Sequence, residues 1–196
     1  MKNEKQIYIL LSNPNTVVAK MIGFYTKAPY NHASIAFDPG LREMYSFGRK
    51  HPLLPMFGGF VKENVRSRVF ERATCAVYSY TVDLETYNKM RAYVRQFEEN
   101  GDLYKYNFLG ILGIVLNMEL GGENAYFCSQ FVCSVFQKAG VKLLNKSAGL
   151  TTPDDLNTCS SLKLVFRGEM ETYRRNYCIR QGVSTTLEQH PYYIAN

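Results

Sequence analysis

The chain has 196 residues, of which 46% are hydrophobic and 14% aromatic, so it is long enough for one domain with its own core and too apolar for a disordered chain. The net charge is +6, but the basic residues are scattered and no known nucleic-acid-binding motif is present, which argues against nucleic acid as a partner. No apolar run reaches the ~18 residues of a membrane span, and the apolar run near the N-terminus is too short for a signal peptide, so we expect a soluble, cytoplasmic protein.

The cysteines fit a reducing compartment. Five are present, at positions 75, 128, 133, 159 and 178. Their odd number argues against a disulfide framework, and no C-x-x-C pair supports a zinc site. Free thiols of this kind are typical of the cytoplasm. We therefore expect no metal and no cofactor, and the sequence leaves the oligomeric state open.

The first third of the chain favours short strands. Residues 7–12 predict a buried strand, and residues 17–25 predict a helix with one apolar face. Residues 32–37 and 42–48 predict a hairpin. The basic, Pro- and Gly-rich stretch 49–68 predicts a loop, which is either a lid over a site or an ordinary surface excursion.

The middle of the chain alternates one strand with two helices. Residues 69–82 are β-rich and lack Pro, which predicts a central strand. Asp83 can cap a helix that continues to about residue 98. Residues 107–118 are apolar nearly all round, which predicts a helix that is buried or faces an apolar ligand.

The last third begins with another helix. Residues 128–139 have apolar side chains at helical spacing, and Gly140 provides a stop signal. Residues 153–156 predict one helical turn, and residues 162–166 predict a final strand. We interpret residues 1–196 as one domain in which 168–196 is a C-terminal extension of uncertain structure.

Cys128 is the candidate nucleophile because it lies at or next to the start of the helix 128–139. Free amides and the helix dipole stabilise an anion there, lower the pKa of a thiol and can bind an oxyanion. The structural alternative is a small core residue, which is our interpretation of Cys133 in the middle of the same helix. The sequence around Cys128 alone does not decide between the two roles.

A nucleophilic cysteine needs a base, and only three histidines are available. His32 opens a predicted strand, where its geometry would be fixed. His51 and His190 each precede a proline, and we expect both on the surface. His32 is therefore the candidate base, although a single histidine before a strand is more often structural.

Several blocks together resemble the permuted NlpC-type, papain-like cysteine hydrolases, which include YiiX-type bacterial proteins and distant relatives of lecithin–retinol acyltransferase. In these proteins the histidine precedes the cysteine in the chain, as it does here. The matching blocks, in the order of the family, are Ile7–Ser12, Thr26–Ala36, Glu43–Gly48, Tyr104–Gly110, Tyr126–Val132 and Thr151–Leu156. No block is specific for the family alone, but the ordered set of blocks over residues 7–166 is fairly specific for it.

The resemblance implies an α+β, circularly permuted papain-like fold: a small antiparallel sheet packed with helices. It also implies that Cys128 is the nucleophile and His32 the base. The third polar residue is Ser46 by position or Glu43 by chemistry, since a carboxylate orients an imidazolium better. Side chains alternate between the faces of a strand, so the hairpin register decides which of the two faces His32. We prefer Ser46.

The resemblance further implies a cysteine-dependent hydrolase or acyltransferase that acts on an amide, ester or thioester. The expected substrate is a small molecule, a peptide or a lipid amide. The alternative is a catalytically silent module that binds such a molecule on the same fold. Formation of an acylated enzyme distinguishes the two, because a binding module forms none.

Overall fold

A six-stranded antiparallel sheet forms the centre of the computed structural model, which describes residues 3–14, 28–49, 58–107, 109–110, 113–114, 118–122 and 124–180. The strand order is β4-β3-β2-β1-β5-β8. The strands are β1 Glu4–Asn13, β2 His32–Ala36, β3 Met44–Arg49, β4 Gly58–Glu63, β5 Thr74–Asp83 and β8 Lys163–Glu169. The expected α+β class with an antiparallel sheet is confirmed.

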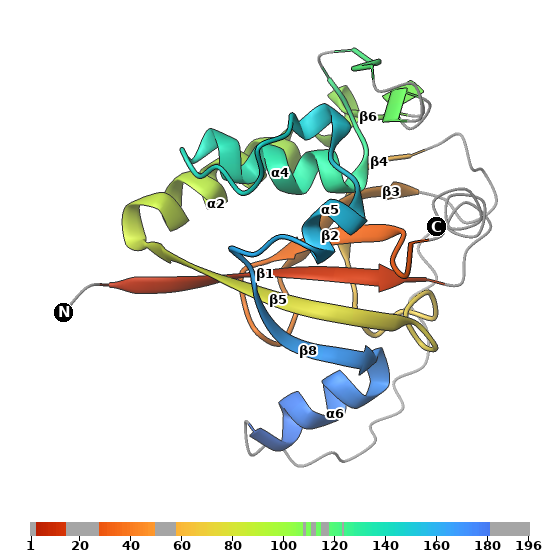
Figure 1. The fold of residues 1–196 in the computed structure, drawn as a ribbon, viewed down its shortest axis with the longest axis vertical. Coiled ribbons are helices and arrows are strands. Elements are labelled where there is room, and N and C mark those ends of the chain that lie inside the picture. Colours follow the sequence, from red (N-terminus) through yellow and green to blue (C-terminus); the bar gives the residue numbers. More distant parts are fainter. Residues whose placement is uncertain are drawn as a thin grey trace.

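Helices cover both faces of this sheet (Figure 1). Two of them, α2 (Leu84–Glu99) and α4 (Cys128–Lys138), lie on one face, and α6 (Met170–Arg180) lies on the other. The smaller elements are the 3-10 turns η1 Gly101–Leu103 and η2 Ala148–Leu150, the helix α5 Pro153–Asn157, and the parallel pair of strands β6 Lys105–Tyr106 and β7 Ala125–Tyr126. Among the described residues no helix has both the length and the apolar character that crossing a membrane requires.

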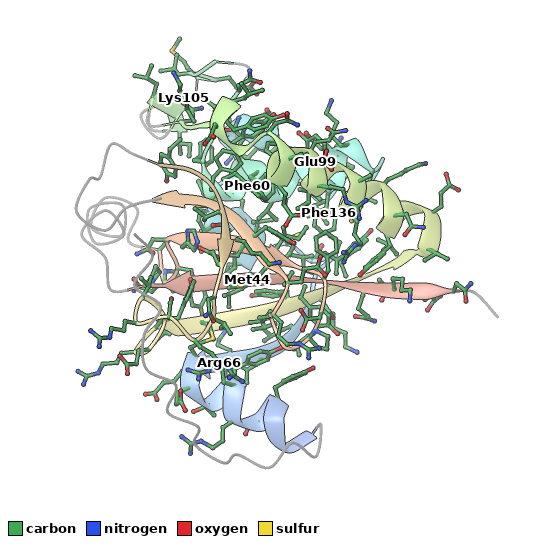
Figure 2. All side chains as sticks on the ribbon, turned by 180° about the vertical axis from the view of Figure 1, so that it is seen from behind. Met44, Phe60, Arg66, Glu99, Lys105 and Phe136 are labelled. Carbon is green, nitrogen blue, oxygen red and sulfur yellow. The ribbon has the colours of Figure 1, made fainter. Side chains whose placement is uncertain are left out.

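The larger core lies between the sheet and helices α2 and α4. Aromatic rings from both layers meet there; Phe60 of β4, for example, lies 5.6 Å from Phe131 of α4 between ring centroids. Figure 2 shows Phe60 and Phe136 between the sheet and the helices. Burying each of these aromatic rings stabilises the fold by roughly a few kcal/mol. The packing of the rings also fixes the position of α4 on the sheet.

The second face of the sheet has its own smaller core. Met170 and Tyr173 of α6 are buried there with Leu10 of β1 and Met44 of β3. The Tyr173 hydroxyl donates a 2.6 Å hydrogen bond to the Pro39 carbonyl oxygen. Residues 170–173 therefore belong to the packed structure.

The ladder between β2 and β3 is short, and this positions the site. Only the pairs Ile35–Tyr45 and Ala36–Met44 join the described residues of the two strands. The first three residues of β2, His32 to Ser34, consequently pair with β1 but not with the described residues of β3. The N-terminal end of α4 lies over this part of β2, as the contacts of Cys128 described below show.

Most predicted elements are confirmed. The strand at 7–12, the hairpin of 32–37 and 42–48 and the central strand at 69–82 correspond to β1, β2–β3 and β5. The predicted helices 83–98 and 128–139 correspond to α2 and α4, and Asp83 does cap α2 by accepting a 2.7 Å hydrogen bond from the Thr86 N–H. The turn at 153–156 lies in α5.

One prediction needs correction. The stretch 49–68 is not a continuous loop, because Gly58–Glu63 pairs with β3 as an edge strand; residues 50–57 lie outside the described residues. Within the expected C-terminal extension 168–196, β8 ends at Glu169 and α6 covers Met170–Arg180. The predicted helix at 17–25 and residues 181–196 lie outside the described residues, as does most of 107–118, where positions 109–110 and 113–114 are helical.

Candidate active site

Cys128 is the first residue of α4. The preceding residue, Phe127, has an extended backbone (φ −108°, ψ 169°), so the chain turns sharply into the helix at the thiol. Two neighbours hold this first turn: the Ser129 hydroxyl donates a 2.7 Å hydrogen bond to the Thr151 carbonyl oxygen, and the Gln130 side-chain oxygen accepts one of 3.3 Å from the Phe127 N–H. The Cys128 side chain is 5% exposed. A rigid helix start thus presents a nearly buried thiol.

His32 is the first residue of β2, and its imidazole contacts a carboxylate. Its Nε2 lies 2.8 Å from Oε1 of Glu63, the last residue of β4, and the two side chains are 15% and 12% exposed. The Ser34 hydroxyl donates a hydrogen bond to the other Glu63 oxygen, Oε2. Both oxygens of this largely buried carboxylate therefore have hydrogen-bond partners, as a charge removed from water requires.

The Cys128 thiol is the other partner of His32. Burial alone would raise the pKa of this thiol, but hydrogen bonding to His32 and the positive charge of the imidazole lower it below its ordinary value of 9.0, with help from the backbone N–H groups of Ala33 and Ser129. Because Nε2 of His32 faces Glu63, Nδ1 is the nitrogen that remains for the thiol. The side chains form a chain from Cys128 through His32 to Glu63.

The charges in this chain support one another. Burial alone would lower the pKa of His32, but the Glu63 charge and hydrogen bonds to Cys128 and Glu63 raise it well above 6.5. Burial alone would raise the pKa of Glu63, but the His32 charge and hydrogen bonds from His32 and Ser34 lower it below 4.5. Each of these pKa shifts favours the ionised form of its group, and the thiolate is the form in which a cysteine acts as a nucleophile.

The site lies at the opening between β2 and β3, and the sheet separates its parts. Ala33 packs in the core under α4. Because successive side chains of a strand point to opposite faces, Ser34 faces the other side of the sheet. Phe60 likewise faces α4, which places Glu63 on the face away from it. The imidazole of His32 contacts Cys128 and Glu63 where β2 has no β3 partner, and a Cβ added to Gly48 of β3 would lie 4.0 Å from its Cε1.

The structure brings Cys128 and His32 together as predicted, but the third group is Glu63 instead of Ser46 or Glu43. Ser46 is buried beside Glu63 and helps to lower the pKa of that carboxylate, yet its hydroxyl makes no well-formed hydrogen bond to the described residues. Glu43 forms a 2.6 Å ion pair with Arg91 of α2 instead. Ser46 thus supports the carboxylate and does not bond to the imidazole.

Sequence reasoning missed Glu63 because it assigned residues 49–68 to a loop. Little signal was present: after Gly58 and Gly59 come two apolar residues, Phe60 and Val61, and then two charged ones, Lys62 and Glu63, without the strict alternation of a half-buried strand. Four residues are a weak indication of a strand. The contact with His32 depends in addition on the pairing of β4 with β3, which the sequence does not specify.

The other cysteines and histidines do not join this group within the described residues. Cys75 and Cys133 are buried, and burial raises the pKa of each thiol to about 12. Both therefore match the expected core role. His51 and His190 lie outside the described residues. No cluster of three or more His, Cys, Asp or Glu side chains in the described part of the chain could hold a metal ion.

Comparison with protein-family models, with curated proteins and with solved structures gave no match for this chain. The candidate site is therefore interpreted from its own geometry and chemistry.

Proposed function

We propose that the chain is a cysteine-dependent hydrolase or acyltransferase that acts on an amide, ester or thioester. The observation that carries this proposal is the largely buried chain of Cys128, His32 and Glu63, in which the pKa of the thiol is lowered and that of the imidazole is raised. A nucleophile, a base and a group that orients the base are the parts that covalent acyl transfer requires. Glu63 supplies the orienting carboxylate that Ser46 could not replace.

In the proposed reaction the Cys128 thiolate attacks the carbonyl carbon of the substrate, and the carbonyl electron pair moves to the oxygen. The oxyanion then collapses and expels the leaving amine, alkoxide or thiolate, which takes a proton from the imidazolium of His32. Water or an acceptor next gives a proton to His32 and attacks the thioester, and the thiolate leaves. Water as acceptor makes the protein a hydrolase; an amine or alcohol makes it a transferase.

The same features support membership of the permuted NlpC-type, papain-like family. A histidine at the start of a strand precedes the cysteine at the start of a helix, and the helix packs on an antiparallel sheet. We infer a small-molecule, peptide or lipid-amide substrate from this proposed membership. A catalytically silent binding module is the competing function, and the acidic partner of His32 weakens the argument for it, because that argument rested on a poor orienting group.

The decisive experiment is the pH dependence of alkylation by iodoacetamide, followed at each cysteine by mass spectrometry. We expect Cys128 to react fastest, with an apparent pKa below that of a free thiol, and His32→Ala to raise this value because the imidazole no longer stabilises the thiolate. Cys133 in the same helix is a built-in control, since its pKa is raised to about 12.

The proposal fails if Cys128 is inert or titrates identically in His32→Ala. A thiol that titrates as expected but gives no burst of acylated enzyme with activated esters and thioesters would instead support the silent binding module.

A further inference from the structure

A buried serine of β2 lies next to the candidate site, on the face of the sheet that carries α6. Ser34 follows His32 by two residues, so the two side chains share this face. The Ser34 side chain is fully buried, and its strand partner Leu10 and Ala36, two residues further on, both belong to the smaller core. A hydroxyl buried among apolar side chains needs a hydrogen-bond partner.

The partner of this hydroxyl is Glu63. The Ser34 Oγ donates a 2.5 Å hydrogen bond to Oε2 of Glu63, while Oε1 of the same carboxylate lies 2.8 Å from Nε2 of His32. A hydroxyl bound to a carboxylate is typically this close because the acceptor is charged. One oxygen of Glu63 thus faces the imidazole and the other faces the serine, which fixes the plane of the carboxylate between them.

The two partners of Glu63 behave differently during the proposed reaction. His32 is an imidazolium when the thiolate attacks, but it gives its proton to the leaving group and is neutral in the acylated enzyme. Burial disfavours the charged form of Glu63, and the charge of the imidazolium is the largest effect that offsets burial. That offset is lost when His32 becomes neutral. The Ser34 hydroxyl does not change its protonation state, so it remains a donor to the carboxylate throughout.

No other ionisable group among the described residues takes over this role. From α4 the pair of His32 and Glu63 faces Cys128, and from β3 it faces the hydroxyl of Ser46. The ionisable side chains in or against the smaller core are neutral near neutral pH because burial raises the pKa of each: Cys75 of β5, Tyr8 of β1 and Tyr173 of α6. The segment 64–73 packs on the same core, but its charged side chains are exposed: Arg66, Arg68, Glu71 and Arg72.

We propose that Ser34 is a positioning residue, whose hydroxyl keeps Glu63 ionised and turned toward His32 while the imidazole is neutral. In that state Nε2–H of His32 donates to Glu63, and Nδ1 is the base that accepts a proton from water or another acceptor. Without the hydroxyl, Glu63 depends on the imidazolium alone, so the pair holds its proton to a higher pH. The inference rests on the proposed function and concerns its second step, the release of the acyl group.

Burst kinetics with p-nitrophenyl acetate separate the two steps in Ser34→Ala. The burst measures acylation, which starts from the imidazolium, and we expect its rate to stay as in the wild type. The steady-state rate measures deacylation, and on the acid side of its pH profile we expect a fall of about tenfold, the effect of losing one hydrogen bond to a charged group. The acid limb of this profile should move up by about one pH unit, so that the wild-type rate is recovered at alkaline pH.

Ser79→Ala is the matched control, because Ser79 is also a buried serine on the face that carries α6. It lies four residues along β5 from Cys75, which is level with Ser12 and His32, so it is about 13 Å from the site along the strand. Both steps in this variant should match the wild type, and the burst amplitude reports the folded fraction of each protein.

A deacylation profile of Ser34→Ala that equals the wild type, or that is lowered equally at every pH, overturns the role of Ser34 and leaves the proposed function standing. If the wild type gives no burst and Cys128 is not activated toward iodoacetamide, the proposed function fails, and the inference fails with it.

Discussion

Glu63 is the residue whose replacement should have the broadest effect. It is a largely buried carboxylate that bonds to His32 and accepts a hydrogen bond from Ser34. In Glu63→Gln the side chain keeps its size but loses the charge that raises the pKa of His32. We expect the apparent pKa of Cys128 to rise as the imidazolium becomes less stable, measured by the pH dependence of alkylation. An unchanged value would show that Glu63 does not act on the thiol through His32.

The same variant predicts a pH-dependent stability. The pKa of Glu63 is lowered from 4.5, so its stabilising contribution is present above pH 4.5 and is lost as the pH falls through the lowered value. The pKa of His32 is raised from 6.5, so its contribution is present below pH 6.5 and is lost as the pH rises through the raised value. Between pH 4.5 and pH 6.5 both contributions are present, so the free energy of unfolding of the wild type should exceed that of Glu63→Gln by about 2 kcal/mol.

Urea denaturation of both proteins at acid, mildly acid and alkaline pH measures this difference. A constant difference across all three conditions would contradict the ion pair.

The sequence predicts those site residues whose position depends on their neighbours along the chain. A cysteine at a helix start and a histidine at a strand start are visible because each depends on its immediate neighbours. Glu63 is not visible in this way. It reaches His32 across an intervening strand, and that contact arises only when the sheet assembles.

Among the elements, the edge strand β4 determines where Glu63 lies. Its first residue is Gly58, where an added Cβ would lie 2.7 Å from the Tyr106 Cβ and 3.0 Å from the Gly48 carbonyl oxygen. An added Cβ at Gly48 would make only ordinary contacts, the nearest at 3.6 Å from Val61. The glycine at position 58 is therefore required by the close approach of β4 to β6.

We expect Gly58→Ala to destabilise the protein by about 1–3 kcal/mol, as overpacking usually does, and Gly48→Ala to cost much less. Thermal unfolding of the two variants side by side measures this contrast. Equal losses would mean that β4 can shift to accommodate the methyl group.

The helices and strands were predicted well where the pattern was long. Helix α2 has a capping residue and a full apolar face, and β5 is a ten-residue strand, so local signals agree with the fold. Strand β4 is six residues long and begins with two glycines, which resemble a turn. Its strand conformation comes from pairing with β3 and from burial of Phe60, both of which are tertiary effects.

The whole molecule depends on both faces of the sheet being covered. Helix α6 provides the cover on the second face, where Met170 is 1% exposed among apolar residues from β1 and β3. We expect Met170→Ala to lower the free energy of unfolding by about 2–4 kcal/mol through loss of buried contacts and formation of a cavity. Urea denaturation measures the loss.

The apparent pKa of Cys128 in Met170→Ala provides the control, since this substitution leaves His32 and Glu63 intact. A loss below about 0.5 kcal/mol, the range of surface substitutions, would show that α6 is not part of the folded unit. The sequence after residue 168 has too weak a periodicity to predict this helix, because Met170 and Tyr173 are the only buried side chains among the described ones of α6.

The short ladder between β2 and β3 has a consequence for how such a protein can diversify. Glu63 and Ser34 lie behind the sheet, Cys128 at the start of α4 lies in front of it, and His32 contacts both sides at the opening. In the proposed reaction the acidity of the Cys128 thiol is therefore set by groups behind the sheet, and the surface offered to a substrate lies in front of it. Under that proposal, substitutions behind the sheet change the reactivity of the thiol without altering the substrate surface, so the two properties can change separately.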